Sequence, residues 1–264
     1  MIAQELFEYL QTLAGDWKYP PNTVDTFKSG QPDWEVSGIA VAWMSYRWAL
    51  QRALELGCNT FITHEPTYYD HFDNNPAMLD IPQVRAKRDW IEQNKLIIIR
   101  CHDLWDQMPK TGITDAWGEF LGLTKVVSGD AFVRVYEIRP RPARLLAAQV
   151  ASKTGKVGQP FVQLIGPGET LVERICIGTG AITPFLSAVE QYRVDLAICT
   201  DDGIDYWRDG AFAIDMNIPI IVINHPVSEE AGVIRLAAHI QAKYPHIPVH
   251  HIPQGCMYQL IGGE

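Results

Sequence analysis

The sequence predicts an α/β protein with largely parallel sheets covered by helices. Apolar strand-like runs alternate with helix-like segments along most of the chain, which is typical of parallel strands joined by helices. Residues 38–66 and 174–203 share one strand–helix–strand plan, so we interpret them as two copies of a duplicated unit. Three predicted strands also end in His and carboxylate residues, which places a candidate site at strand C-terminal ends.

The N-terminal half is predicted to begin with a helix. In residues 1–15, Ile2, Leu6 and Leu10 fall on one face at helical spacing. Apolar runs bounded by polar or glycine residues then predict strands at 38–43, 58–63 and 96–101. Helical periodicity predicts helices at 45–56, 81–94 and 114–123, and Gly57 stands where the first of these should have its C-cap.

The C-terminal half continues the alternation. Predicted strands cover 132–138, 161–165, 174–178, 196–200 and 218–224. Predicted helices cover 143–154, 184–192, 211–215 and 229–243. Because the segment 126–170 carries no ligand-type cluster, we predict two intertwined α/β domains. Residues 1–125 with 215–264 form the metal-ligand-bearing domain, and residues 126–214 form a second, inserted domain.

Composition excludes several classes of protein. The chain has 264 residues, 47% of them hydrophobic, and a net charge of −9, which argues against broad nucleic-acid binding. Five cysteines without a CxxC pair, most of them in apolar runs, indicate buried thiols of a cytoplasmic protein. No apolar run approaches the roughly 18 residues that a membrane helix needs, and the N-terminus lacks the pattern of a signal peptide.

The three ligand clusters carry the functional prediction. His64-Glu65 follows one predicted strand, His102 to Asp106 follows the next, and His225 to Glu229 follows the last. The C-terminal ends of parallel strands meet at one edge of a sheet. Imidazoles and carboxylates gathered there would suit one divalent metal, or two metals bridged by carboxylates.

In their order and spacing these clusters resemble motifs of the Nif-three-like dinuclear-metal proteins, the GTP cyclohydrolase 1 type 2 homologues. The family motifs are Thr-His-His-Pro, His-Thr-Asn-x-Asp and Gly-His-x-x-Ser/Thr-Glu. The matching segments here are 63–66, 102–106 and 224–229. The chain departs from the pattern at Glu65, where the family has His, and at Asp201, where the family has Gly. It also departs at 103–104, where the family has Thr-Asn, and at Asn224, where the family has Gly.

The resemblance implies two divalent ions per chain. The metal ligands would be His64, Glu65, Asp106, His225 and Glu229. Two imidazoles with three carboxylates favour Mn, Fe or Mg more than a three-imidazole set would, with Zn also suitable. His102, Asp103 and Asp201 are candidates for the outer partners that orient metal ligands. The resemblance also implies a homo-oligomer, a ring-shaped homohexamer whose metal sites face an internal cavity.

The implied function is metal-dependent hydrolysis of a nucleotide-like or heterocyclic small molecule by metal-bound water, as in a type 2 GTP cyclohydrolase. Two alternatives use the same ligands. The first is a non-catalytic metal-binding or interaction protein, and the second is a metal-dependent phosphoesterase. A closed, saturated site would favour the non-catalytic alternative, whereas an open metal position would favour an enzyme.

Each candidate ligand also has a plain structural interpretation. His64 could be a loop residue, Glu65 a strand-end acid, and Asp106 a turn residue or helix N-cap. Glu229 could be an acid favoured by the dipole of a helix first turn.

Two further motifs are interpreted as structural. Residues 178–180 (Gly-Thr-Gly) lack the full dinucleotide-binding fingerprint, so we predict a turn. His250 and His251 are adjacent in a predicted short strand, so they face opposite sides and cannot share an ion.

Overall fold

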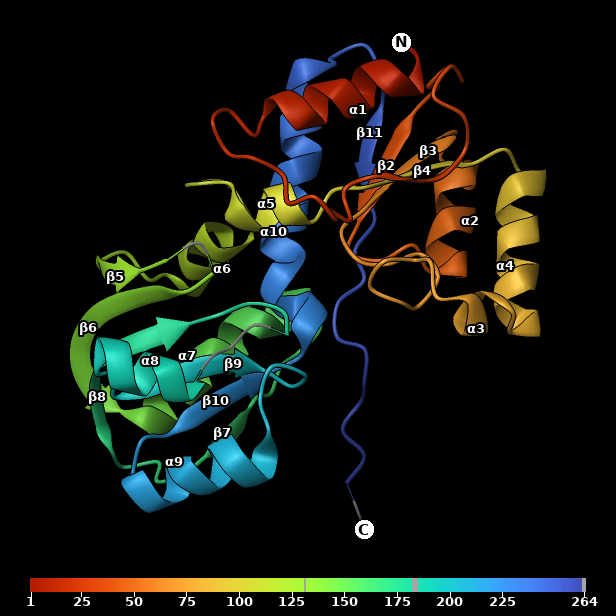
Figure 1. Ribbon diagram of the computed structural model, residues 1–264. Coiled ribbons are helices and arrows are strands. Elements are labelled where there is room, and N and C mark those ends of the chain that lie inside the picture. The colour runs from red at the N-terminus through yellow and green to blue at the C-terminus, as the bar shows by residue number, and fades with distance from the viewer. Residues whose placement is uncertain (131, 182–184, 263–264) are drawn as a thin grey trace. The chain divides into compact units, whose positions relative to one another are not determined.

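The computed structural model describes residues 1–130, 132–181 and 185–262, and it has a mixed α/β architecture with two mixed sheets (Figure 1). The chain divides into two compact units. Unit 1 consists of Met1–Met108 and Val233–Gln254. Unit 2 consists of Pro109–Gly232 and the segment from Gly255 onward.

Unit 1 contains a five-stranded sheet in the order β1-β4-β3-β2-β11. The strands are β1 (Phe27–Ser29), β4 (Ile97–Arg100), β3 (Thr60–Thr63), β2 (Ile39–Ala42) and β11 (Val249–His251). All neighbours are parallel except β1, which is antiparallel to β4. Strands β2, β3 and β4 are buried along their whole length, because a central parallel strand is covered on both faces.

The helices of unit 1 are α1 (Ala3–Thr12), α2 (Arg47–Glu55), α3 (Pro76–Leu79), α4 (Pro82–Gln93), α5 (Asp103–Gln107) and the second part of α10 (His225–Lys243). Helices α2 and α4 lie on the same face of the sheet (Figure 1). Leu50 of α2 and Ile91 of α4 share a core cluster with Phe61 and Ile98 from the strands. These contacts fix β3 and β4 and therefore the residues that follow them.

Unit 2 contains a six-stranded sheet in the order β5-β6-β8-β9-β10-β7. Its strands are β5 (Val126–Gly129), β6 (Arg134–Pro142), β8 (Leu171–Ile177), β9 (Leu196–Thr200), β10 (Ile220–Ile223) and β7 (Gln163–Ile165). The central strands β8, β9 and β10 are parallel, whereas β5, β6 and β7 pair antiparallel with their neighbours.

The helices of unit 2 cover both faces of this sheet. They are α6 (Ile113–Leu121), α7 (Ala143–Thr154), α8 (Phe185–Tyr192) and α9 (Ala211–Met216), with the short turns η1 (Gly155–Val157) and η2 (Tyr206–Gly210). Alternate residues of β9 face opposite sides. Ile198 packs with α6 and α7, and Ala197 packs with α8 and α9.

The predicted alternation of strands and helices is confirmed for the longer elements. Helix α7 and strand β9 have the predicted bounds. The expectation of a largely parallel arrangement is wrong for β1, β5, β6 and β7, which pair antiparallel. The predicted helix 184–192 begins at a residue outside the described part of the chain, and α8 is described from Phe185.

Helix α10 begins at His225, not at 229 as predicted. Pro226 stands in its first turn, where a proline is tolerated because no intrahelical N–H is needed there. His225 and Glu229 therefore lie one turn apart on a single helix. The predicted corner between a strand and a helix is not found at this position.

The unit boundaries fall at 108/109, 232/233 and 254/255, whereas the predicted domain boundaries fall at 125/126 and 214/215. The predicted division into a ligand-bearing domain and an inserted domain stays a prediction. Both segments of the proposed duplication contain a parallel strand–helix–strand unit, β2-α2-β3 and β8-α8-β9.

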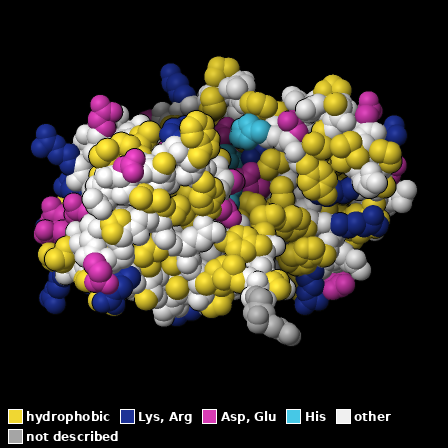
Figure 2. All heavy atoms as spheres, turned by 90° about the horizontal axis from the view of Figure 1, so that it is seen from below, with side chains coloured by type: hydrophobic (Ala, Val, Ile, Leu, Met, Phe, Trp, Pro, Cys, Tyr) yellow, Lys and Arg dark blue, Asp and Glu magenta, His cyan; other side chains and the backbone are white. Residues whose placement is uncertain are grey.

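Most of the cysteines are buried, as their positions in apolar runs indicate. All five cysteines are described and free of disulfides, and only Cys256 is not fully buried. In the part of the chain that the structure describes, every helix is too short or too polar to cross a bilayer. Some large hydrophobic side chains do reach the surface, notably Trp48 in unit 1 and Trp207 in unit 2, and Figure 2 shows hydrophobic side chains on one face.

Candidate metal centre

Two neighbouring parallel strands of unit 1 position the first two histidines of the site. Strands β3 and β4 pair in register, with Thr63 opposite Arg100. His64 follows β3 directly, and His102 follows β4 after one intervening residue. Their rings stack with centroids 4.7 Å apart. His64, a predicted ligand, and His102, predicted as an outer partner, therefore lie together beyond the C-terminal ends of neighbouring strands.

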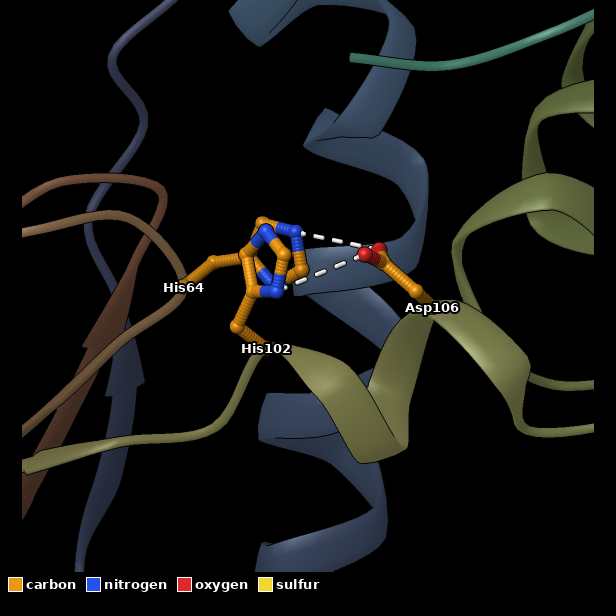
Figure 3. A group of neighbouring side chains, drawn as sticks. All are labelled: His64, His102 and Asp106. Atoms are coloured by element: carbon orange, nitrogen blue, oxygen red, sulfur yellow. Dashed lines mark ion pairs between the residues drawn. The ribbon is translucent and has the colours of Figure 1, made fainter. Parts of the chain in front are cut away.

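Asp106 completes a group of three ligand-type side chains in unit 1 (Figure 3). It lies on α5, one turn after His102. Its Oδ1 lies 3.3 Å from Nε2 of His64, and its Oδ2 lies 3.5 Å from Nδ1 of His102. One candidate ligand atom from each of the three residues lies within 4.8 Å of the other two.

The hydrogen bonds of His64 fit a metal ligand. Its Nδ1 lies 3.1 Å from the carbonyl oxygen of Cys101, and because a carbonyl only accepts, Nδ1 carries the proton. Nε2 faces Oδ1 of Asp106, so a proton or a metal cation between these two atoms would be held by both. An outer partner on one ring nitrogen with the other nitrogen available is the usual arrangement of metal-bound histidine.

His102 has carboxylate partners on both sides. Its Nδ1 lies 3.0 Å from Oδ1 of Asp103, and its Nε2 lies 3.8 Å from Oε1 of Glu65. Burial disfavours the charged imidazolium, but Asp106 and Asp103 outweigh this effect and raise the pKa of His102. Burial also opposes the charge of Asp103, yet hydrogen bonds from His102 and Thr23 hold the pKa of Asp103 well below its ordinary range.

A buried aspartate from a distant segment holds this loop in place. Asp25 accepts the backbone N–H groups of His102, Asp103 and Leu104 at 2.6, 3.0 and 3.0 Å. These are N–H groups at the start of α5, which have no partner within the helix. Asp25 thereby fixes the turn that carries both His102 and Asp106.

Glu65 flanks the group and is held by a buried arginine. The Oε2 atom of Glu65 lies 3.0 Å from Nη2 of Arg100, whose side chain has no solvent exposure. Charged side chains are rarely buried without a partner of opposite charge. Glu65 therefore has a structural partner as well as a place beside His64 and His102.

Unit 2 contains a second pair of ligand-type residues. On α10, Nε2 of His225 lies 3.1 Å from Oε1 of Glu229. The other ring nitrogen, Nδ1, lies 2.7 Å from Oδ2 of Asp202, which follows β9. Partial burial acts against the charge of Asp202, but the contact with His225 lowers the pKa of that carboxyl. The histidine again has one anchored nitrogen and one nitrogen facing a carboxylate.

A glycine borders this pair at close range. Gly180 has φ +58°, and a Cβ added there would lie 2.9 Å from Oε1 of Glu229 and 3.0 Å from Nε2 of His225. Its carbonyl accepts the hydroxyl of Thr200. The predicted Gly-Thr-Gly turn therefore leaves space at the His225–Glu229 pair that any side chain would fill.

The structure distributes the predicted ligands over both units. His64, Glu65 and Asp106 belong to unit 1, and His225 and Glu229 belong to unit 2. The assignment of all five to one dinuclear centre stays a prediction.

Among the predicted outer partners, Asp103 contacts the ring of His102, and His102 itself stands beside His64 and Asp106. Asp201 contacts the backbone N–H of His225 at 3.1 Å. Its neighbour Asp202 contacts the ring of His225.

Sequence reasoning missed Asp25, Arg100, Asp202 and Gly180. Only Arg100 gave a usable signal, because a lone arginine at the end of the apolar run 96–101 requires a buried counter-charge. Other histidines of the chain lie outside both groups. His71 is exposed and meets His102 edge-on with centroids 5.9 Å apart, and β11 carries His250 and His251.

Comparison with known proteins agrees with this architecture. The family model described as Duf34/NIF3 (NGG1p interacting factor 3) matches residues 8–254. No curated protein matches the chain. The solved structures of similar fold include Staphylococcus aureus hypothetical protein SA1388, at 18% identity, TM-score 0.80 and coverage of 99% of each chain.

A Bacillus cereus protein related to NIF3 has a TM-score of 0.80 at 12% identity, with 99% of each chain covered. Reduced HcgD from Methanocaldococcus jannaschii has a TM-score of 0.75 at 17% identity, covering 96% of this chain and 98% of that one. At these identities the similarity shows the fold. The family match extends over most of the sequence, so the chain belongs to the Duf34/NIF3 family.

Proposed function

We propose that this chain binds divalent metal ions and acts as a metal-dependent hydrolase on a nucleotide-like or heterocyclic substrate. The observation that carries the proposal is the group of His64, His102 and Asp106, whose candidate ligand atoms lie within 4.8 Å of one another. Two imidazoles and a carboxylate suit Zn, Mn or Fe. The His225–Glu229 pair supports a second ion-binding position, and the family resemblance implies two divalent ions per chain.

Partial exposure favours an enzyme over a closed structural site. The side chain of His64 is fully buried, but those of His102 and Asp106 retain 18% and 13% of their exposure. Structural zinc sites are usually closed by four protein ligands, whereas catalytic sites keep a position open. The solvent-facing side of this group supports the catalytic arrangement, in which a metal position stays open.

Neighbouring residues of the chain would orient the side chains that hold the ion. A bound divalent ion supplies Lewis-acid activation of water near neutral pH. Asp103 contacts Nδ1 of His102, the ring nitrogen that also lies 3.5 Å from Oδ2 of Asp106, and thereby orients the ring toward the centre. The Cys101 carbonyl does the same for His64. Asp25 keeps His102 and Asp106 one turn apart.

Metal content of matched histidine variants tests the binding step. After loading with Zn or Mn and dialysis, we expect His64→Ala and His102→Ala to retain less metal per chain than the wild type, because both lose the ion held by the group in unit 1. The expected loss of affinity exceeds about 100-fold, because loss of an outer partner alone typically costs 10–100-fold. His246→Ala is the control, because His246 is exposed and belongs to the same unit. Equal metal retention in all four proteins would contradict the site.

A substrate screen tests the catalytic step. The metal-loaded wild type should hydrolyse at least one nucleotide or related heterocycle, and a chelator should abolish turnover. Retained metal without turnover of any nucleotide, heterocycle or phosphoester would favour the non-catalytic metal-binding alternative. Cleavage of phosphoesters alone would favour the phosphoesterase alternative.

A further inference from the structure

Arg100, the last residue of β4, makes contacts with three backbone or side-chain groups around the centre. Its Nε donates to the carbonyl oxygen of His64 at 2.9 Å. Its Nη1 donates to the carbonyl oxygen of His71 at 2.5 Å, and its Nη2 donates to Oε2 of Glu65 at 3.0 Å. One guanidinium therefore positions the backbone of His64 and the carboxylate of Glu65.

Arg100 carries its positive charge in a buried position. Its side chain has no solvent exposure, and a guanidinium stays protonated in proteins. A buried cation needs a nearby anion, because removing one partner of a buried ion pair leaves an uncompensated charge. Glu65 provides that anion, so the two side chains together carry no net charge.

The same contact limits how Glu65 can bind a metal. Its Oε2 is directed at Arg100, and its Oε1 lies 3.8 Å from Nε2 of His102. An unrestrained carboxylate could offer both oxygens and a full negative charge. Held by Arg100, Glu65 presents one oxygen toward the histidine side, and the negative charge is balanced.

We propose that Arg100 is a positioning residue that sets the metal preference of the centre by holding Glu65 as a single-oxygen, charge-balanced donor. This inference rests on the proposed metal binding at His64, His102 and Asp106. Hard ions such as Mn²⁺ and Mg²⁺ favour anionic oxygen ligands, whereas Zn²⁺ also accepts neutral nitrogen-rich sets. Arg100 therefore raises the preference for Zn²⁺ over Mn²⁺.

A double-mutant cycle on Arg100 and Glu65 tests the proposal. Dissociation constants for Zn²⁺ and Mn²⁺ are measured by competition with a chromophoric chelator. We expect Arg100→Lys to lower the Zn²⁺-over-Mn²⁺ preference about 10-fold, in line with other residues that act through a ligand. In a Glu65→Gln background the same Arg100→Lys change should have little effect on that preference, because the carboxylate it restrains is gone.

The cycle separates this role from a purely structural one. If Arg100 acts only through the carbonyls of His64 and His71, Arg100→Lys shifts the metal preference equally in both backgrounds, and the proposal is overturned. Wild-type protein that binds neither ion refutes the proposed metal site itself. If the wild-type protein binds Zn²⁺ and the effects of the two substitutions on metal preference are additive, only the role of Arg100 is refuted.

A second measurement avoids the risk that a buried arginine variant fails to fold. In crystals of the wild-type protein loaded with Zn²⁺, we expect Glu65 to bind through Oε1 while Oε2 stays at hydrogen-bond distance from Arg100. Bidentate binding by Glu65, or a Glu65 side chain turned away from the ion, would overturn the proposal whatever the variants show.

Discussion

At the scale of single residues, His64 and His225 are held in the same way. Each has Nδ1 near an oxygen acceptor, the Cys101 carbonyl or the Asp202 carboxylate, and Nε2 near a second carboxylate. A neutral imidazole held by one nitrogen presents the other as a lone pair. Both rings are therefore held in an orientation that suits a metal ligand.

Gly180 provides a residue-scale test at the His225–Glu229 pair. An added methyl group would lie 2.9 Å from Oε1 of Glu229, so we expect Gly180→Ala to push the pair apart and weaken metal binding by unit 2. The positive φ of +58° adds strain of about 1–2 kcal/mol. Metal titration and thermal unfolding measure the two effects separately.

Gly15→Ala is the matched control. Gly15 has a similar φ of +55°, but an added Cβ would meet nothing within 4 Å. It should lose comparable stability and keep full metal binding. If both variants bind metal like the wild type, the space beside Glu229 has no part in a metal site.

Residue types and the family resemblance together predicted part of the candidate site. Imidazoles and carboxylates follow predicted strands, and the family motifs select His64, Asp106, His225 and Glu229 among them. Asp25 could not be selected, because it lies far from His102 in sequence and its role depends on a tertiary contact. Asp202 was missed as well, because its contact with His225 depends on the pairing of β9 with β10.

At the scale of elements, α5 is a short helix whose position depends on Asp25. Its span of five residues is too short to be stable by itself. The Asp25 carboxylate replaces the hydrogen bonds that its first N–H groups lack. The location of α5, and with it that of Asp106, is therefore a tertiary effect that helical periodicity cannot show.

Removing this cap should weaken both the fold and the site. We expect Asp25→Ala to lower the free energy of unfolding by about 2–4 kcal/mol, because buried N–H groups are left without acceptors. Metal affinity should fall as well, since His102 and Asp106 lose their fixed separation. Asp25→Asn, which keeps an acceptor oxygen, should be intermediate in both chemical denaturation and metal titration. Unchanged metal affinity in Asp25→Ala would show that α5 does not support the centre.

The longer helices and strands could be predicted because the spacing of their apolar residues in the sequence matches the positions that are buried in the fold. Strand β9 and helix α7 have the bounds that their apolar patterns indicate. The start of α10 was missed because His225 and Pro226 were interpreted as loop residues, although a proline suits the first helical turn. Antiparallel pairing of β6 was also missed, because strand direction depends on how connections cross and not on residue pattern.

At the scale of the whole molecule, the family and the two mixed sheets are established. The ring-shaped homohexamer implied by the family resemblance stays a prediction. Exposed aromatic residues such as Trp48 and Trp207 are compatible with protein interfaces, where aromatic side chains are enriched.

The central claim is that His64, His102 and Asp106 hold a divalent ion. Anomalous diffraction at the zinc or manganese edge, from crystals of the metal-loaded wild-type protein, tests it most directly. We predict a peak at about 2.0–2.2 Å from Nε2 of His64 and from a carboxylate oxygen of Asp106. Ordered, metal-loaded crystals without a peak there, or with peaks only at surface histidines such as His246, would contradict the account.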